Sequence, residues 1–172
     1  MQRARDIGFV TDKPVYHGSA GPEFSAFDPK KRGSMTQAPT AREAYWVAHD
    51  PDTAQFFAEM KAAKDHQDPW IMPLLYRSEK RANINLTGDE KMHEIAATLA
   101  QAWDDGFTSV QINNYSSPKG PTSILAVKNP NQLRSPSAAF DPRKKGSGKL
   151  LAGLGAGVIG AETLVPPDSD GP

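Results

Sequence analysis

Hydrophobic and polar positions along the chain predict several short strands. Aromatic and β-branched runs bounded by glycine, proline and polar residues are typical of strands. Such runs lie at residues 15–18, 45–48, 70–76, 107–113 and 123–127. A further run at residues 82–86 either continues the strand at 70–76 or pairs with it.

Two segments have apolar residues at helical spacing. The first follows Asp50-Pro51, because aspartate suits the N-cap and proline the first helical position. The second covers residues 87–104, where Thr87 and Glu90 predict a capping box at the start. Helices and strands alternate here without a regular strand–helix–strand order. An α+β domain is therefore expected rather than a doubly wound parallel sheet.

Length and sequence bias suggest one domain with extensions at both ends. Residues 1–14 are expected to form an N-terminal lead-in and residues 15–147 the compact domain. Residues 148–172 are expected to form a Gly/Ala/Leu-rich segment that ends in a flexible tail. The longest apolar stretch, residues 150–159, has about half the length that crosses a bilayer, so no membrane span is expected.

Composition removes several kinds of chemistry. The 172 residues include no cysteine, which excludes disulfides, thiolate catalysis and cysteine zinc sites. The four histidines have no paired metal-ligand spacing, so no metal is expected. Twenty basic and twenty acidic residues cancel, and net charge therefore does not favour nucleic acid or an anionic membrane.

One nine-residue segment occurs twice. Residues 26–34, Ala-Phe-Asp-Pro-Lys-Lys-Arg-Gly-Ser, recur almost unchanged at residues 139–147. One interpretation is a pair of Asp-Pro turns, each fixed by a buried phenylalanine. The other is a pair of basic loops that contact one phosphate-bearing ligand or one partner. The sequence leaves both open.

Four motifs in order carry a family resemblance over residues 15–142. They are Val-Tyr-His-Gly-Ser at 15–19, Ala-Tyr-Trp-Val at 44–47 with the helix that follows, Trp-Asp-Asp-Gly-Phe at 103–107, and Asn-Pro-Asn-Gln-Leu-Arg-Ser at 129–135. Together they resemble the ADP-ribosyltransferase family in its His-Tyr-Glu branch. The nearest likeness is to modules of phage polyvalent and head-associated proteins. The resemblance implies a split mixed β-sheet with flanking helices.

The resemblance also implies NAD as the substrate and gives a role to five positions. It implies that His17 donates to a ribose hydroxyl and that the Gly18 backbone pairs with the nicotinamide carboxamide. Tyr45 would stack on the nicotinamide ring, since aromatic faces attract a flat cation. Phe56 would close the other side of that ring, and Thr53 would bond the carboxamide oxygen.

The catalytic glutamate of the family falls on Ile124, which is a departure from the pattern. Isoleucine cannot stabilise a ribosyl cation, and losing such a group typically costs about 10² to 10³ in rate. Glu23 and Glu43 are other acids, but their spacing recommends neither. A mono-ADP-ribosyltransferase of reduced activity, with a protein or nucleic acid as acceptor, is one expectation.

The alternative is a catalytically inactive virion or structural protein that uses the fold and residues 148–172 for assembly. The resemblance implies the host cytoplasm or a phage virion as its location.

Overall fold

The computed structural model describes residues 1–152, and within them seven strands form one sheet. The strands are β1 (Phe9–Ala20), β2 (Tyr45–Ala48), β3 (Pro69–Arg77), β4 (Arg81–Asn85), β5 (Ser109–Ser117), β6 (Gly120–Val127) and β7 (Leu133–Arg134). Their order is β4-β5-β6-β2-β1-β3-β7. β4 runs parallel to β5 and the other neighbours are antiparallel. The expected mixed α+β class is confirmed.

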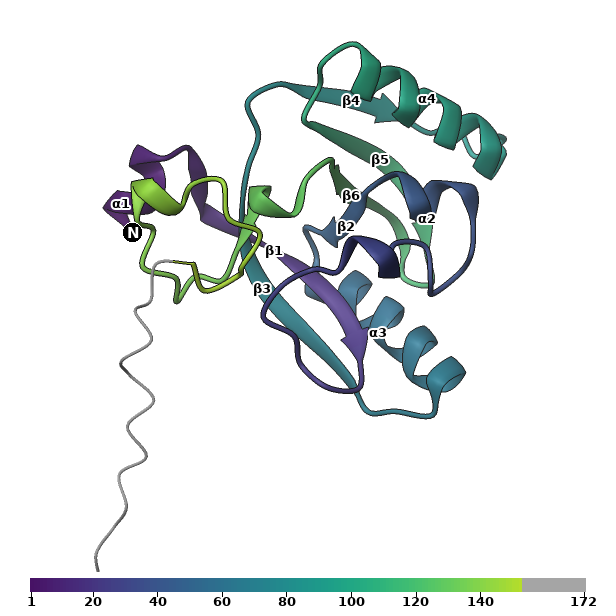
Figure 1. Ribbon diagram of the computed structural model, residues 1–172. Coiled ribbons are helices and arrows are strands. Elements are labelled where there is room, and N and C mark those ends of the chain that lie inside the picture. Colours follow the sequence, from purple (N-terminus) through teal and green to yellow (C-terminus); the bar gives the residue numbers. More distant parts are fainter. Residues whose placement is uncertain (153–172) are drawn as a thin grey trace, which may run out of the picture.

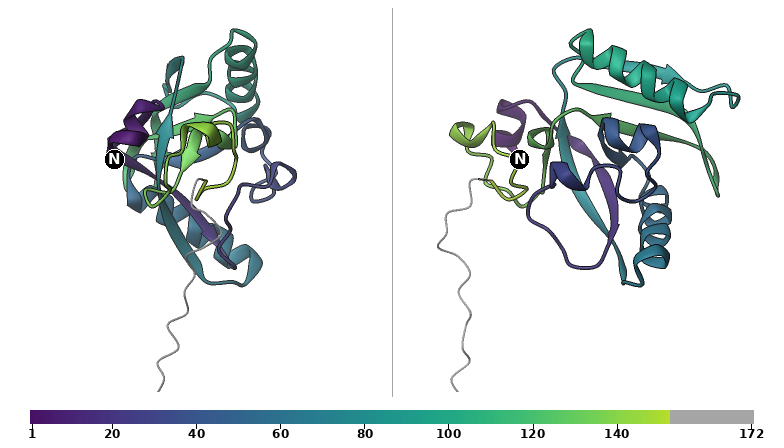
Figure 2. Two further views of the ribbon diagram at one scale, coloured as in Figure 1. Left: turned by 60° about the vertical axis from the view of Figure 1, so that its left-hand side comes forward. Right: turned by 45° about the vertical axis from the view of Figure 1, so that its right-hand side comes forward.

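Four α-helices accompany the sheet in the described residues: α1 (Gln2–Asp6), α2 (Pro39–Glu43), α3 (Pro51–Asp65) and α4 (Met92–Asp104). α3 packs against β1 and β3, while α4 lies beside β4 and β5 (Figure 1). The views in Figure 2 show α1 next to the last described segment, at the end of the molecule away from α4.

Strand alternation divides the core between the two faces of the sheet. Ile124 and Ala126 of β6 belong to one cluster, with Leu99 and Trp103 of α4. Leu125 of β6 belongs to the other, with Val15, Tyr45, Leu74 and Leu133. Because successive side chains of a strand point to opposite faces, this division fixes which face each site residue can reach.

The N-terminus differs from the expected lead-in. β1 begins at Phe9, six residues before the predicted start of the domain, and α1 precedes it. Phe9 is buried and its ring lies 5.4 Å from that of Phe140. The pairing of β1 with β3 shifts register between Val10 and Val15, where charged Asp12-Lys13 stands. That irregularity interrupts the alternation and explains why the pattern did not predict a strand there.

Two further elements differ from expectation. β4 pairs in parallel with β5 and not with β3, because α4 forms the crossover between β4 and β5. α4 begins at Met92 and not at Thr87. The Thr87 amide does donate to Glu90 at 2.7 Å, but that bond closes a turn ahead of the helix.

The C-terminal segment begins inside the fold. Lys149 forms a β-bridge with Ala26, and the Leu150 amide donates to the Ser25 carbonyl at 2.8 Å. Leu150 is buried in the cluster around Leu133. The rest of the predicted tail, residues 153–172, lies outside the described residues.

α3 approaches β1 closely at Gly18. A Cβ at Gly18 would overlap the Ala54 carbonyl oxygen and lie 2.9 Å from the Ala58 amide nitrogen. Both are backbone atoms of a helix, so neither can move alone. The requirement for glycine at this position thus has a packing cause of its own.

We predict that Gly18→Ala destabilises the protein by about 1–3 kcal/mol, because the methyl group forces β1 and α3 apart. Urea unfolding measures the loss. Gly146→Ala is the matched control, since a Cβ there meets nothing within 4 Å. Equal stability of the two variants would contradict the packing role of Gly18.

Candidate functional site

The candidate site lies where β1 and β2 separate. These strands are registered at a single pair, Tyr16 and Ala48. Beyond that pair a cleft of about 960 Å³ is lined by residues 16–20 of β1, residues 44–48 around β2, the intervening loop and part of α3. His17, Gly18, Tyr45 and Ile124 all line this cleft.

His17 closes part of the gap between the strands. Its Nδ1 lies 2.9 Å from the Trp46 carbonyl oxygen. A carbonyl can only accept, so Nδ1 carries the proton and Nε2 of the neutral ring is an acceptor. Burial lowers the pKa of His17, and nearby Lys61 acts in the same direction. Nε2 of the neutral ring can therefore accept a hydrogen bond from a ligand hydroxyl but cannot donate one. A bond between His17 and a ribose hydroxyl would thus run in the opposite direction to the one expected from the sequence.

Aromatic side chains from the loop after β1 pack on the His17 ring. Phe27 lies 4.9 Å from it and Phe24 5.9 Å, both edge-on. Phe27 also lies 5.5 Å from the Tyr45 ring, so it contacts both His17 and Tyr45. The two predicted site residues thus share an aromatic neighbour that belongs to the chain itself.

Tyr45 is buried and belongs to the same face of the sheet as Val15 and Leu125. The Arg32 guanidinium lies 5.4 Å from the centre of its ring. Burial raises the pKa of the Tyr45 hydroxyl, which keeps this group protonated near neutral pH. Tyr45 thus offers an apolar aromatic surface with a cation already beside it.

Ile124 lies on the opposite face. It pairs with Ala48 of β2 and Ile112 of β5 and is buried in the cluster around Leu99. Of the predicted catalytic positions, His17 and Tyr45 are therefore brought together, and Ile124 reaches the cleft from the other side of the sheet. Ser123 points to the face of Leu125 and donates to Asn113 at 2.9 Å.

Thr53 and Phe56 do not line the cleft. The Thr53 hydroxyl is buried and donates to Asp50 at 2.9 Å, where it supports the cap of α3. Phe57, one residue beyond Phe56, lines the cleft and lies 6.0 Å from Tyr115. The helical turn of α3 decides which of two adjacent phenylalanines faces inward, and strand-to-helix spacing could not predict it.

Basic and acidic side chains both line the mouth of the cleft. Lys61 is paired with Asp65 on α3. Lys31 and Arg32, from the first repeated segment, are exposed and line the cleft. Lys64 fixes the end of this segment by donating to the carbonyls of Ser34 and Met35, at 2.7 and 2.8 Å. The exposed side chains of Lys31 and Arg32 could contact an anionic part of a ligand.

The repeated segments form similar turns in different surroundings. Asp28 and Asp141 each accept from the amide two residues later, at 2.9 Å. Phe27 packs on His17, whereas Phe140 packs on Phe9 with a positive φ of 52°. The two phenylalanines thus contact different clusters, and the Asp-Pro turn interpretation accounts for both.

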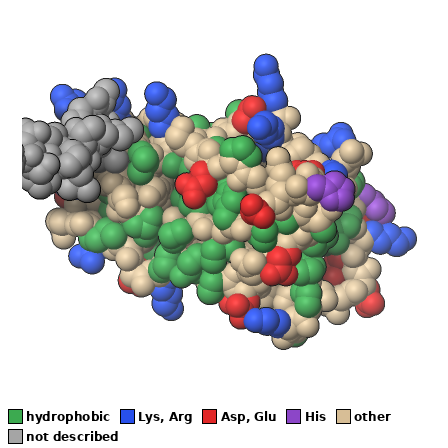
Figure 3. Space-filling model, turned by 90° about the horizontal axis from the view of Figure 1, so that it is seen from below, with side chains coloured by type: hydrophobic (Ala, Val, Ile, Leu, Met, Phe, Trp, Pro, Cys, Tyr) green, Lys and Arg blue, Asp and Glu red, His purple; other side chains and the backbone are tan. Residues whose placement is uncertain are grey.

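Sequence reasoning missed Phe24 and Phe27 as part of the site. The loop they occupy is rich in polar and small residues, and only the fold brings it back over His17. Figure 3 shows the face seen from below, where hydrophobic side chains gather in the middle and charged ones surround them. Within residues 1–152 no group of three or more metal-ligating side chains occurs. No helix of that region has the length and hydropathy to cross a membrane.

The fold and site define a mixed α+β protein whose sheet opens into an aromatic cleft beside a histidine. No protein-family model, curated protein or solved structure matches the chain. The function must therefore be argued from the cleft itself.

Burial of His17 makes stability depend on pH in a defined direction. The pKa in the folded state lies below the unfolded value of about 6.5, so the unfolded chain binds more protons as pH falls below that value. The contribution of His17 is fully present above about pH 6.5 and is lost as pH falls from there toward the folded pKa.

We predict that His17→Gln reduces the loss of unfolding free energy between about pH 7.5 and pH 5.5. Urea unfolding at both values measures it. His93→Gln is the control, because His93 is exposed and its substitution should leave the slope unchanged. A slope in His17→Gln equal to that of wild type would show that His17 is not buried as described.

Proposed function

We propose that the cleft between β1 and β2 binds NAD and that the protein is a mono-ADP-ribosyltransferase-like NAD-binding protein with reduced turnover. The observation that carries the proposal is the meeting of His17, Gly18 and Tyr45 in one cleft. These are the residues that the family resemblance assigns to the nicotinamide end of the ligand.

The size and chemistry of the cleft support a dinucleotide. About 960 Å³ lies at the upper end of the volumes that hold small-molecule ligands. Aromatic rings at Tyr45 and Phe57 suit a flat ring, and exposed Lys31 and Arg32 suit a pyrophosphate. Nε2 of neutral His17 can accept a hydrogen bond that a ribose hydroxyl donates.

A transfer reaction in this cleft would be dissociative. The bond between nicotinamide and C1′ of the ribose would break, and neutral nicotinamide would leave with the bonding electron pair. The acceptor would then attack C1′ and give up its proton to a base. Ile124 supplies no such base, and Glu23 is an exposed carboxylate that lines the cleft. Slow transfer or hydrolysis is therefore the expected activity.

A second candidate is a catalytically inactive protein that keeps the fold for assembly, for example in a virion. Two observations favour it. Ile124 stands where the family has its glutamate, and Phe27 packs against both His17 and Tyr45. In this case the cleft would bind no NAD. The protein would then modify no acceptor and would have no enzymatic role in the host cytoplasm.

Calorimetric titration with NAD separates the two candidates. We predict binding at about millimolar NAD or below for wild type, and binding at least about tenfold weaker for His17→Gln, which removes the ring acceptor. His93→Gln is the control on the surface and should bind as wild type does. No heat of binding for wild type at millimolar NAD would exclude the NAD proposal and leave the assembly candidate.

The two repeated phenylalanines provide a second matched pair of variants. A flat ring that enters between His17 and Tyr45 must displace Phe27, so Phe27→Ala is predicted to tighten NAD binding. Phe140→Ala removes the same side chain at the corresponding position of the second segment and should leave affinity unchanged. Weaker binding by Phe27→Ala would mean that Phe27 is a wall of the ligand site and not its occupant.

A further inference from the structure

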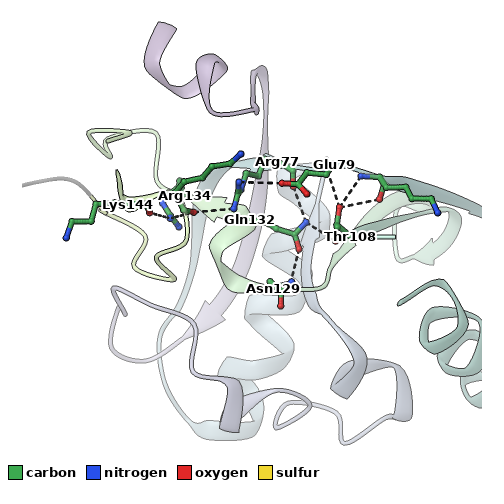
Figure 4. Close-up of polar contacts among 9 residues, drawn as sticks. Arg77, Glu79, Thr108, Asn129, Gln132, Arg134 and Lys144 are labelled. Atoms are coloured by element: carbon green, nitrogen blue, oxygen red, sulfur yellow. Dashed lines mark hydrogen bonds and ion pairs between the residues drawn. The ribbon is translucent and has the colours of Figure 1, made fainter. Parts of the chain in front are cut away.

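Two buried arginines lie outside the cleft and play no part in the proposed NAD binding. Arg77 ends β3 and Arg134 lies in β7, the strand that pairs with it. Their exposed fractions are 8% and 2%. Both guanidinium groups lie 5.9 Å from the ring of Phe9 (Figure 4 shows their polar surroundings).

The donors of this arginine pair go to backbone carbonyls. Arg134 donates to its neighbour Leu133 at 3.0 Å, and the other bonds go to the second repeated segment. Arg134 donates to the carbonyls of Lys144 and Lys145 at 3.2 and 3.4 Å, and Arg77 donates to Lys145 at 3.2 Å. Nε of Arg77 is buried and has no hydrogen-bond partner in the described residues. The carbonyls therefore use only part of the donor capacity of the pair.

Among residues 1–152, little negative charge lies close to the pair. Glu79 is the acid that approaches Arg77, and its carboxylate lies 3.8 Å from Nη1 with the side chain 72% exposed. An exposed carboxylate at that distance contributes little. Burial, together with the charge of Arg77, lowers the pKa of Arg134 to about 10. Two desolvated like charges without a close counter-charge are costly, and a bound anion would relieve that cost.

Exposed lysines add to the positive charge at this end of the molecule. Lys144 and Lys145 belong to the turn whose carbonyls the two arginines hold, and both side chains are exposed. Arg143 in the same turn is already paired with Asp141 at 3.0 Å. The arginine pair thus holds a turn that carries two further exposed cations.

We propose that Arg77 and Arg134, with Lys144 and Lys145 at the entrance, bind a phosphate-type oxyanion. Guanidinium groups match tetrahedral oxyanions because they offer several N–H donors in a fixed plane. Glu79 marks the solvent side of Arg77, and its carboxylate stands where the oxyanion approaches. Binding displaces Glu79 from its place beside Nη1 of Arg77. The oxyanion is either free phosphate or a phosphoryl group carried on another molecule.

A purely structural role for the arginines makes a different prediction. If they only hold the turn at residues 142–145, removing Arg77 destabilises the fold and phosphate has no specific effect. An oxyanion site instead makes stability and binding respond to phosphate, and makes the response depend on Glu79. Glu79→Gln separates the two roles because it leaves the bonds from Arg77 and Arg134 to the turn in place.

The test is calorimetric titration of the full chain with inorganic phosphate up to about 10 mM at constant ionic strength, with chloride as the replaced anion. Wild type is expected to bind phosphate. Arg77→Met should bind at least about tenfold more weakly, as expected for loss of a charged hydrogen-bond donor. Glu79→Gln should bind several-fold more tightly, because the competing carboxylate is gone.

Lysines of the two repeated segments provide a matched pair of variants. Lys144→Gln should weaken phosphate binding, whereas Lys30→Gln, an exposed lysine that does not line the cleft, should leave it unchanged. Phosphate binding that Lys31→Gln abolishes would place the anion in the cleft and overturn the proposal. So would unchanged affinity in Glu79→Gln, or no phosphate binding by wild type.

A second titration with glycerol 3-phosphate identifies the source of the oxyanion. Affinity equal to that for inorganic phosphate supports a phosphoryl group carried on another molecule. Binding of inorganic phosphate alone supports the free ion held in an enclosed site.

Discussion

The single registered pair between β1 and β2, Tyr16 with Ala48, governs how the middle of this protein is built. On one side of the pair the strands diverge, and backbone groups that would pair in a continuous sheet need other partners. His17 supplies one of them by donating to the Trp46 carbonyl. The close packing of α3 on Gly18 holds β1 in place from the other face. A cleft in the middle of a sheet is stable here because a side chain and a helix replace the missing pairing.

The same constraint explains the aromatic cluster. An opening in a sheet exposes apolar side chains from both core clusters, and the loop between β1 and β2 covers part of it with Phe24 and Phe27. Lys64 and the bridge between Ala26 and Lys149 fix this loop at either end of the first repeated segment. The proposed ligand site is thus bounded by a segment whose position depends on α3 and on the C-terminal part of the described chain.

The second repeated segment covers the edge of the sheet at β3 and β7, whereas the first covers the cleft in the middle of the sheet. There the buried donors of Arg77 and Arg134 hold the carbonyls of the turn, and Phe140 packs on Phe9. The two turns share a sequence and an aspartate cap, yet one covers aromatic rings and the other covers guanidinium groups. The proposed oxyanion site and the proposed NAD site are therefore distinct and rest on different residues.

The sequence by itself determined the α+β class, β2, β3 and the capped start of α3, because each depends on local spacing and on caps that neighbouring residues complete. It also indicated His17 and Tyr45, which the structure brings into one cleft. Only the tertiary structure decided that β1 starts at Phe9, that β4 pairs with β5, and that Phe57 and not Phe56 faces the cleft. It alone set Ile124 on the face opposite Tyr45 and brought Arg77 beside Arg134. These outcomes depend on partners distant in the chain and on the direction of each side chain, which local spacing does not contain.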